Sequence, residues 1–235
     1  MKNSKKIYIT NSIICLVLLS LVLMTTTFTN IYVSSVNNDN LVYNGDTTSN
    51  KVSLMFNVYW GTEYLNGILE TLDNYNVTTT FFVGGSWVEK ETNMLQTIMS
   101  YGHEIGNHGY FHLDHSKLSY DQNKEEISTC HNLVKVYTDY DMKLFAPPSG
   151  AFNNATIDSA TELGYLTIMW SKDTIDWRDK DSNLIFSRAT KNLKGGDLIL
   201  MHPTENTLLA LPAILEYIKL NNLEVVTVSD NIGLI

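Results

Sequence analysis

The chain has 235 residues, of which 44% are hydrophobic and 17% are charged, and its formal net charge is −9. This length suits one globular domain with a sizeable core and a small appendage, and the acidic balance argues against a nucleic-acid partner. Cys15 lies in an apolar run and Cys130 on the apolar side of a predicted helix, so we expect no disulfide framework.

The N-terminal segment has the order of an export signal. Lys2, Lys5 and Lys6 precede a mostly apolar stretch at residues 7–24. A span within residues 8–33 is long enough to cross a bilayer. No Ala-x-Ala cleavage site follows, although residues 33–35 offer a weak one. We therefore predict an uncleaved transmembrane anchor at residues 1–33, with the remaining chain on the extracytoplasmic side of the cell membrane.

Residues 34–50 are rich in Asn, Ser, Asp and Thr, which predicts a flexible stalk before a folded domain at residues 51–235. In that domain, apolar runs alternate with segments of helical periodicity. Ser119 and Gln122 form a capping-box pattern at the start of one helix. Helices are expected to begin at residues 62, 87, 119, 155, 184 and 208, and strands to lie at residues 52–56, 77–83, 104–105, 143–145, 165–170, 197–201 and 224–228.

Alternating strands and helices predict an α/β fold with a parallel sheet covered by helices. About seven such units favour a distorted (β/α)7 barrel, closed or nearly closed, whose chemistry gathers at the carboxyl ends of the strands. No phosphate-binding glycine loop follows a strand, so a nucleotide-binding fold has no support. Polar residues do follow the strand ends, at Asn57, His108, His112, residues 147–150, Asp173, Asp176 and His202.

His108 and His112 have the H-x-x-x-H spacing that lets two imidazoles bind one metal ion. Gly106 and Gly109 allow sharp turns beside them. The alternative for this spacing alone is a pair of surface loop histidines.

Together these segments resemble the polysaccharide deacetylases of the NodB-homology group, carbohydrate esterase family 4, over about residues 52–228. The family's metal-binding histidine pair matches His108 and His112, and its D-x-x-D-W motif matches residues 173–177. The resemblance implies a divalent metal, for which we expect zinc, with Asp176 orienting His202 as the general acid. It also implies removal of acetyl groups from chitin-like or peptidoglycan glycans, on which Trp60, Tyr110, Pro148 and Trp177 are candidate substrate-binding residues.

Two motifs depart from the family pattern. Asn57 stands at the position of the catalytic base, Val58 at that of a metal ligand, and Ala146 at that of an arginine that pairs with the base. Asn cannot accept a proton at neutral pH, so catalysis needs compensation. Glu63 is a candidate base or third ligand, and Asp114 or His115 are candidates to join the histidine pair. The form of residues 56–64 resembles a branch of the family found in spore-forming bacteria.

The sequence therefore predicts a membrane-anchored, metal-dependent hydrolase that removes N-acetyl groups from cell-wall glycan and acts as a monomer. The alternative is a catalytically silent relative that binds glycan or a partner protein through the same groove.

Overall fold

The computed structural model describes residues 40–234 of the chain. The transmembrane anchor expected at residues 1–33 lies outside the described residues. Among the residues that are described, no helix combines the length and the apolar character needed to cross a membrane.

In this described part of the chain, nine strands form one sheet, and every pairing between named strands is parallel. The strand order is β1-β6-β5-β4-β3-β2-β8-β7, and β9 pairs with β2. The strands are β1 (Leu41–Val42), β2 (Lys51–Val58), β3 (Thr80–Val83), β4 (Glu104–Asn107), β5 (Leu144–Phe145), β6 (Leu166–Ile168), β7 (Lys172–Asp173), β8 (Leu198–Met201) and β9 (Glu224–Val225).

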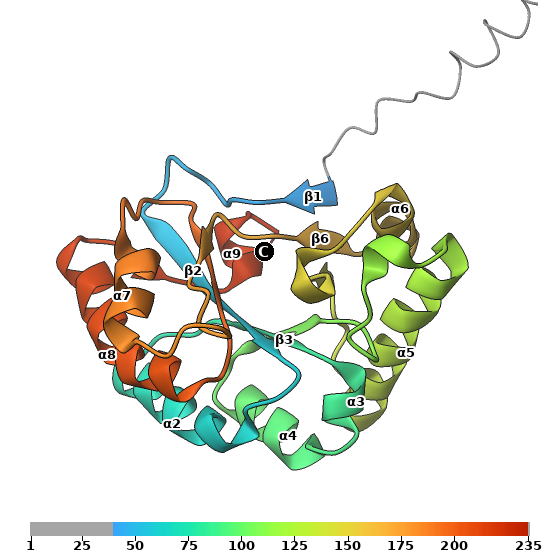
Figure 1. Cartoon of the computed structure of the whole chain (residues 1–235), viewed down its shortest axis with the longest axis horizontal. Coiled ribbons are helices and arrows are strands. Elements are labelled where there is room, and N and C mark those ends of the chain that lie inside the picture. Colours follow the sequence, from blue (N-terminus) through green and yellow to red (C-terminus); the bar gives the residue numbers. More distant parts are fainter. Residues whose placement is uncertain (1–39, 235) are drawn as a thin grey trace, which may run out of the picture. The chain divides into compact units, whose positions relative to one another are not determined.

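Helices surround the outer side of these strands (Figure 1). They are α2 (Thr62–Asn74), α3 (Gly85–Val88), α4 (Thr92–Ser100), α5 (Tyr120–Thr138), α6 (Asn154–Glu162), α7 (Ser182–Thr190) and α8 (Glu205–Leu220). The short helix α9 (Val228–Asn231) instead lies on the inner side (Figure 1), where Val228 joins the buried residues of the neighbouring strands. The short 3-10 helices are η2 (His115–Lys117) and η3 (Pro148–Gly150).

The sheet is an α/β half-barrel of parallel strands rather than a closed (β/α)7 barrel. Over residues 40–234 its hydrogen-bonded order runs from β1 to β7 and does not close into a ring. The chain at residues 166–173 supplies both β6, which pairs with β5, and β7, which pairs with β8. Two short strands of one segment therefore pair near opposite ends of the strand order. This interruption explains why the barrel is distorted.

The helix signals in the sequence are largely confirmed. Helix α2 buries the predicted face of Leu65, Ile68, Leu69 and Leu72, and both hydrogen bonds of the predicted capping box are present at the start of α5. The single helix expected at residues 87–101 is instead α3 and α4. The backbone of Glu91 leaves the helical region there, with φ −121° and ψ 36°.

Strand β2 separates two apolar clusters because its side chains alternate between the faces of the sheet. Phe56 and Val58 belong to the larger cluster, together with the buried residues of α2. Met55 belongs to the smaller one, together with Phe82 and Leu200 from the neighbouring strands. The larger cluster joins sheet to helices, and the smaller one fills the inside of the half-barrel.

The flexible stalk expected at residues 34–50 is wrong for residues 40–50. Strand β1 pairs with β6, the Gly45 amide donates to the Gly196 carbonyl at 2.7 Å, and the Asp46 amide donates to the Asn231 carbonyl at 2.9 Å. The polar composition of this segment suggested a stalk. The two-residue strand β1 is held by backbone hydrogen bonds, which no side-chain pattern in the sequence could reveal. The folded domain therefore includes these residues.

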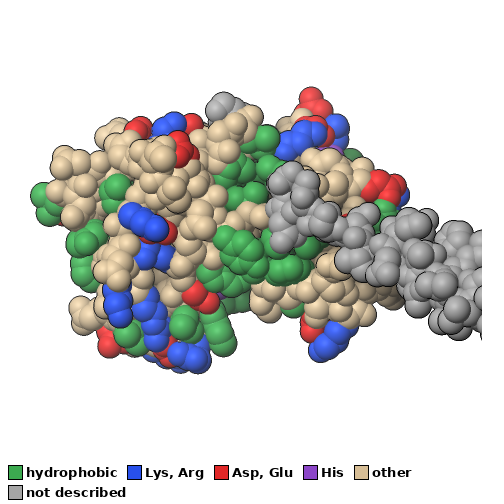
Figure 2. Space-filling model, turned by 90° about the horizontal axis from the view of Figure 1, so that it is seen from above, with side chains coloured by type: hydrophobic (Ala, Val, Ile, Leu, Met, Phe, Trp, Pro, Cys, Tyr) green, Lys and Arg blue, Asp and Glu red, His purple; other side chains and the backbone are tan. Residues whose placement is uncertain are grey.

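On the face shown in Figure 2, exposed hydrophobic side chains gather between regions in which acidic and basic side chains mix. The negative net charge of the chain is thus not concentrated on this face.

A chain that begins at Lys51 is expected to be less stable than one that begins at Asn40, by about 2 kcal/mol from the lost backbone hydrogen bonds. This corresponds to a fall of about 4–8 °C in the melting temperature, measurable by circular dichroism. Equal melting temperatures for the two chains would contradict the assignment of β1 to the domain.

Candidate active site

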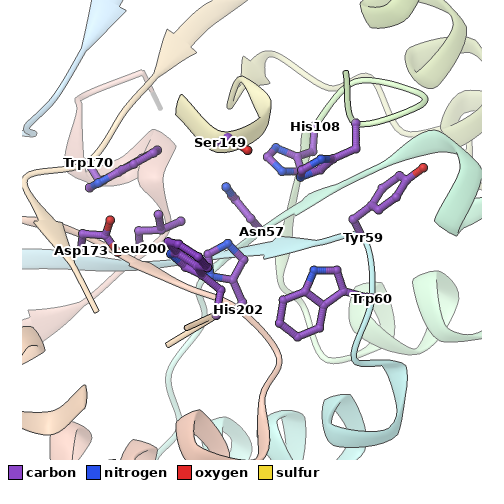
Figure 3. Close-up of a pocket in the computed structure, with 11 residues that line it drawn as sticks. Asn57, Tyr59, Trp60, His108, Ser149, Trp170, Asp173, Leu200 and His202 are labelled. Atoms are coloured by element: carbon purple, nitrogen blue, oxygen red, sulfur yellow. The ribbon is translucent and has the colours of Figure 1, made fainter. Parts of the chain in front are cut away.

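A pocket of about 530 Å³ opens at the carboxyl ends of the strands, as the fold class requires. Its lining comes from β2 and β8, from the segments after β2, β4, β5, β7 and β8, and from the β6–β7 segment. In the view of Figure 3, Asn57 lies between His108 and His202. The lining residues are Asn57, Tyr59, Trp60, His108, His112, Ser149, Trp170, Asp173, Trp177, Leu200 and His202.

His108 is oriented by a hydrogen bond from its ring to the backbone. Its Nδ1 lies 2.7 Å from the Ala146 carbonyl oxygen. A carbonyl only accepts, so Nδ1 carries the proton and Nε2 keeps its lone pair. This is the arrangement in which metal-binding histidines are commonly held.

His112 stands beside His108, with ring centroids 5.1 Å apart and planes inclined by 71°. Its backbone is left-handed, with φ 57°, which costs on the order of 1–3 kcal/mol in a residue other than glycine and is characteristic of functional sites. Burial lowers the pKa of both imidazoles, that of His108 to well below its ordinary value. Both rings are therefore neutral at pH 7, the state in which imidazole binds a metal.

His202 and Asp176 form the predicted pair. The ring Nδ1 lies 2.8 Å from Asp176 Oδ1, and the His202 amide donates to Oδ2 at 2.6 Å. The Thr207 hydroxyl donates to the same Oδ2 at 2.6 Å. Trp60 stacks on the His202 ring, with planes 2° apart and centroids 5.9 Å apart. The imidazole is thus fixed on two sides.

Asn57 is 3% exposed, and within residues 40–234 its Oδ1 has no hydrogen-bond partner. A buried polar atom without a partner is costly, and it indicates a site for a ligand. Val58, expected at the ligand position of the family, lies among the helix-facing core residues. It does not line the pocket, so Asn57 is the β2 side chain that reaches the imidazoles.

The candidate metal site is therefore unlike a site of two histidines and one carboxylate. Among the described residues there is no group of three or more His, Cys, Asp or Glu that would hold a metal ion. The donors that fit are two neutral imidazoles and the unpartnered amide oxygen of Asn57. The predicted histidine pair is brought together, but Glu63 and Asp114, the candidates for a replacement carboxylate ligand, do not join it.

Glu63 is exposed in the first turn of α2 and does not line the pocket, so its expected role as base or third ligand is wrong for this structure. Asp114 instead accepts from the Ser116 amide and pairs with Lys117 at 2.8 Å. His115 is buried and bonded to Asn123, and burial lowers its pKa to about 4.

Two of the four predicted substrate-binding residues line the pocket, and two do not. Trp60 and Trp177 line it and are 44% and 57% exposed. The Tyr110 hydroxyl instead donates to Glu89 at 3.1 Å, and the ring packs on the larger core cluster. Pro148 is buried, while its neighbour Ser149 reaches the pocket. Both predictions failed because adjacency in sequence does not fix the direction of a side chain in a loop.

Four lining residues were not named as candidates from the sequence: Tyr59, Ser149, Trp170 and Leu200. Asp173 was named as a polar residue that follows a predicted strand, and Ser149 lies within residues 147–150, which were noted for the same reason. Tyr59 packs on the His112 ring at a centroid distance of 4.9 Å. Its position directly after β2 was the available signal.

The polysaccharide deacetylase family model matches residues 44–168, more than half of the chain. The chain belongs to this family. The Asp176–His202 pair lies beyond the matched residues, so its geometry is the evidence that the site continues there.

Two relatives from bacilli illustrate the similarity. YlxY of Bacillus subtilis, an uncharacterized protein, is 38% identical over 178 residues, which cover 76% of this chain and 56% of that protein. A peptidoglycan-N-acetylglucosamine deacetylase of Bacillus cereus is 33% identical over 173 residues, covering 71% of this chain and 81% of that protein. The chain thus spans little more than half of the length of YlxY.

Among solved structures, BA3943 of Bacillus anthracis is described as a pseudoenzyme of carbohydrate esterase family 4. It superposes with a TM-score of 0.80 at 32% identity, over 82% of this chain and 68% of that one. A BA3943 mutant described as having restored enzymatic activity also gives a TM-score of 0.80, at 31% identity over 82% and 71% of the two chains.

Titration of the purified full chain with Zn²⁺ is expected to reveal a site that His112→Ala weakens. The affinity should fall by more than the roughly 10- to 100-fold that follows loss of an outer-shell partner. Isothermal titration calorimetry measures this. His131→Ala is the control, because His131 lies on α5 and pairs with Tyr165 and Asp141. Unchanged affinity in His112→Ala would contradict the site.

Proposed function

We propose that this domain removes N-acetyl groups from a cell-wall glycan, with a divalent metal as cofactor. One observation carries the proposal: the imidazole pair lines the same pocket as His202, whose ring is bound by Asp176. The first group is suited to bind a metal and the second to move a proton. The similarity to the Bacillus cereus deacetylase supports peptidoglycan as the glycan.

His108, His112 and Asn57 Oδ1 are the residues that would hold the metal, and we propose zinc because imidazole ligands suit it. The chemistry supplied by such an ion is polarisation of the acetyl carbonyl and activation of water. Every other step falls to the side chains of this chain.

His202 is the proposed general acid. Its Nδ1–H donates to Asp176 at 2.8 Å, which leaves Nε2 as the nitrogen that exchanges a proton with the substrate. The carboxylate fixes the orientation of the ring. Delivery of that proton to the departing nitrogen completes cleavage of the amide bond. Trp60 and Trp177 flank the pocket as surfaces for sugar rings.

The general base is the weak part of the site. Asn57 has no proton-accepting group at neutral pH, and Asp173 is the carboxylate among the lining residues. Its Oδ1 accepts from the Ile175 amide at 2.8 Å. A positioned base contributes ~10²- to 10⁴-fold to a rate, so we propose slow turnover.

A second candidate function is binding of glycan or a partner protein without catalysis. Asn57 favours it because this residue stands in place of a base. Val58 favours it because it faces the helices and cannot bind a metal in the pocket. Ala146 favours it because its only polar contact with the site is the backbone carbonyl that binds His108. The similarity to BA3943, which is described as a pseudoenzyme, supports this candidate too.

We further propose that residues 1–33 anchor the chain as a monomer in the cell membrane, with the domain outside. The lysines that precede an apolar segment support this orientation. A link with sporulation rests on the resemblance of residues 56–64 to the branch of the family in spore-forming bacteria.

Acetate release from acetylated chito-oligosaccharides or peptidoglycan fragments tests the proposal. The purified full chain with Zn²⁺ is expected to release acetate slowly, and Asn57→Asp to raise the rate by ~10²- to 10⁴-fold because it supplies a base. His202→Ala should abolish the release.

Asn74→Asp, an exposed change at the end of α2, is the matched control and should leave the rate unaltered. Acetate release by Asn57→Asp but not by the native chain would favour the silent candidate. No release by either chain would contradict the deacetylase proposal.

A further inference from the structure

The loop that joins the two imidazoles is held by side chains from outside it. The Gly109 amide donates to Asn107 Oδ1 at 2.9 Å. The next two amides, of Tyr110 and Phe111, both donate to Glu126 Oε2, at 2.9 and 2.8 Å. All three amides between His108 and His112 therefore bind buried side-chain oxygens.

The opposite side of the loop is fastened as well. The Gly85 amide donates to the Gly109 carbonyl at 2.9 Å, and the Ser86 amide donates to the Tyr110 carbonyl at 3.0 Å. The loop is thus bonded to the start of α3 on one side and to α5 on the other.

The two side chains that bind the amides are themselves fixed. Asn107 is fully buried, and its Nδ2 donates to the Ile127 carbonyl of α5 at 2.8 Å. Glu126 is 7% exposed and lies on the buried face of α5. A Cβ on Gly109 would lie 2.9 Å from His115 Nε2 and 3.4 Å from Glu126 Oε2. The space between the loop and α5 has no room for another side chain.

This support explains how His112 keeps its left-handed backbone. Such a conformation persists only where the surrounding structure imposes it. The loop amides supply that constraint through Glu126, since bonds from N–H groups to a carboxylate are stronger than neutral ones.

We infer that Glu126, assisted by Asn107, is a positioning residue that holds His112 opposite His108 before any metal binds. It touches neither metal nor substrate and acts through the loop backbone. The inference rests on the proposed function in one respect, that the two imidazoles bind a metal.

Hydrogen exchange of the metal-free full chain tests the positioning itself. The amides of residues 109–111 are expected to be protected in the native chain, and those of Tyr110 and Phe111 to exchange at least tenfold faster in Glu126→Ala. Glu125→Ala is the matched control, because it removes the same charge from the exposed neighbouring position of α5. Unchanged exchange in a folded Glu126→Ala would overturn the inference.

Titration with Co²⁺, followed by its visible absorption, tests the consequence for the metal. Glu126→Ala is expected to bind Co²⁺ about 10- to 100-fold more weakly than the native chain, as loss of an outer-shell partner does. Glu126→Gln removes the charge but keeps an acceptor oxygen for both amides, so it should recover most of the affinity. If the negative charge alone mattered, Glu126→Gln would bind Co²⁺ as weakly as Glu126→Ala.

If Glu126→Ala does not fold, Glu126→Asp takes its place in both experiments. Its shorter side chain is expected to release at least one amide and to weaken Co²⁺ binding at least tenfold, and native-like values would overturn the inference. The native chain could also fail to bind Co²⁺ while protection of its loop amides still depends on Glu126. That result would contradict the proposed metal site but would establish that Glu126 positions the loop.

Discussion

The register of β2 is the constraint on which the site depends. The strand is clamped on both sides, with Met55 opposite Thr80 of β3 and Leu200 of β8. A shift by one residue would move every side chain to the other face of the sheet. Val58 would then enter the pocket and Asn57 would be buried against the helices, where its amide has no ligand to meet.

The pocket brings together two groups that reach it from different parts of the sheet. The imidazole pair follows β4 and is held by a backbone carbonyl and a fastened loop. His202 follows β8 and is held by Asp176 and Trp60. Asn57 lies between them in Figure 3. The pocket thus combines an imidazole pair, an imidazole bound to a carboxylate and, between them, a neutral amide where a base would have to be a carboxylate.

Much of this arrangement could be predicted because local signals decided it. The H-x-x-x-H spacing, the residues after strand ends and the capping box at Ser119 each follow from the period and chemistry of a short segment. The strand-end rule correctly placed His202 in the pocket that holds the histidine pair, and Asp176 binds the His202 ring from behind the lining. Residues 1–33 lie outside the described chain, so the anchor stays a prediction.

The failures share one cause, which is that they depended on the direction of a side chain or on a distant backbone partner. Tyr110 is next but one to His108, yet Glu126 binds its amide and its ring turns to the core. Glu63 lies close to β2 in sequence but points to solvent from α2. An acidic residue within a helix, such as Glu126, carries no signal that it supports a loop 15 residues away.

The most direct test of this account is anomalous diffraction at the zinc edge from crystals of the full chain grown with Zn²⁺. The account predicts a peak within bonding distance of His108 and His112 and next to Asn57, inside the pocket that His202 lines. A peak elsewhere, or two imidazoles turned apart with no zinc between them, would contradict it.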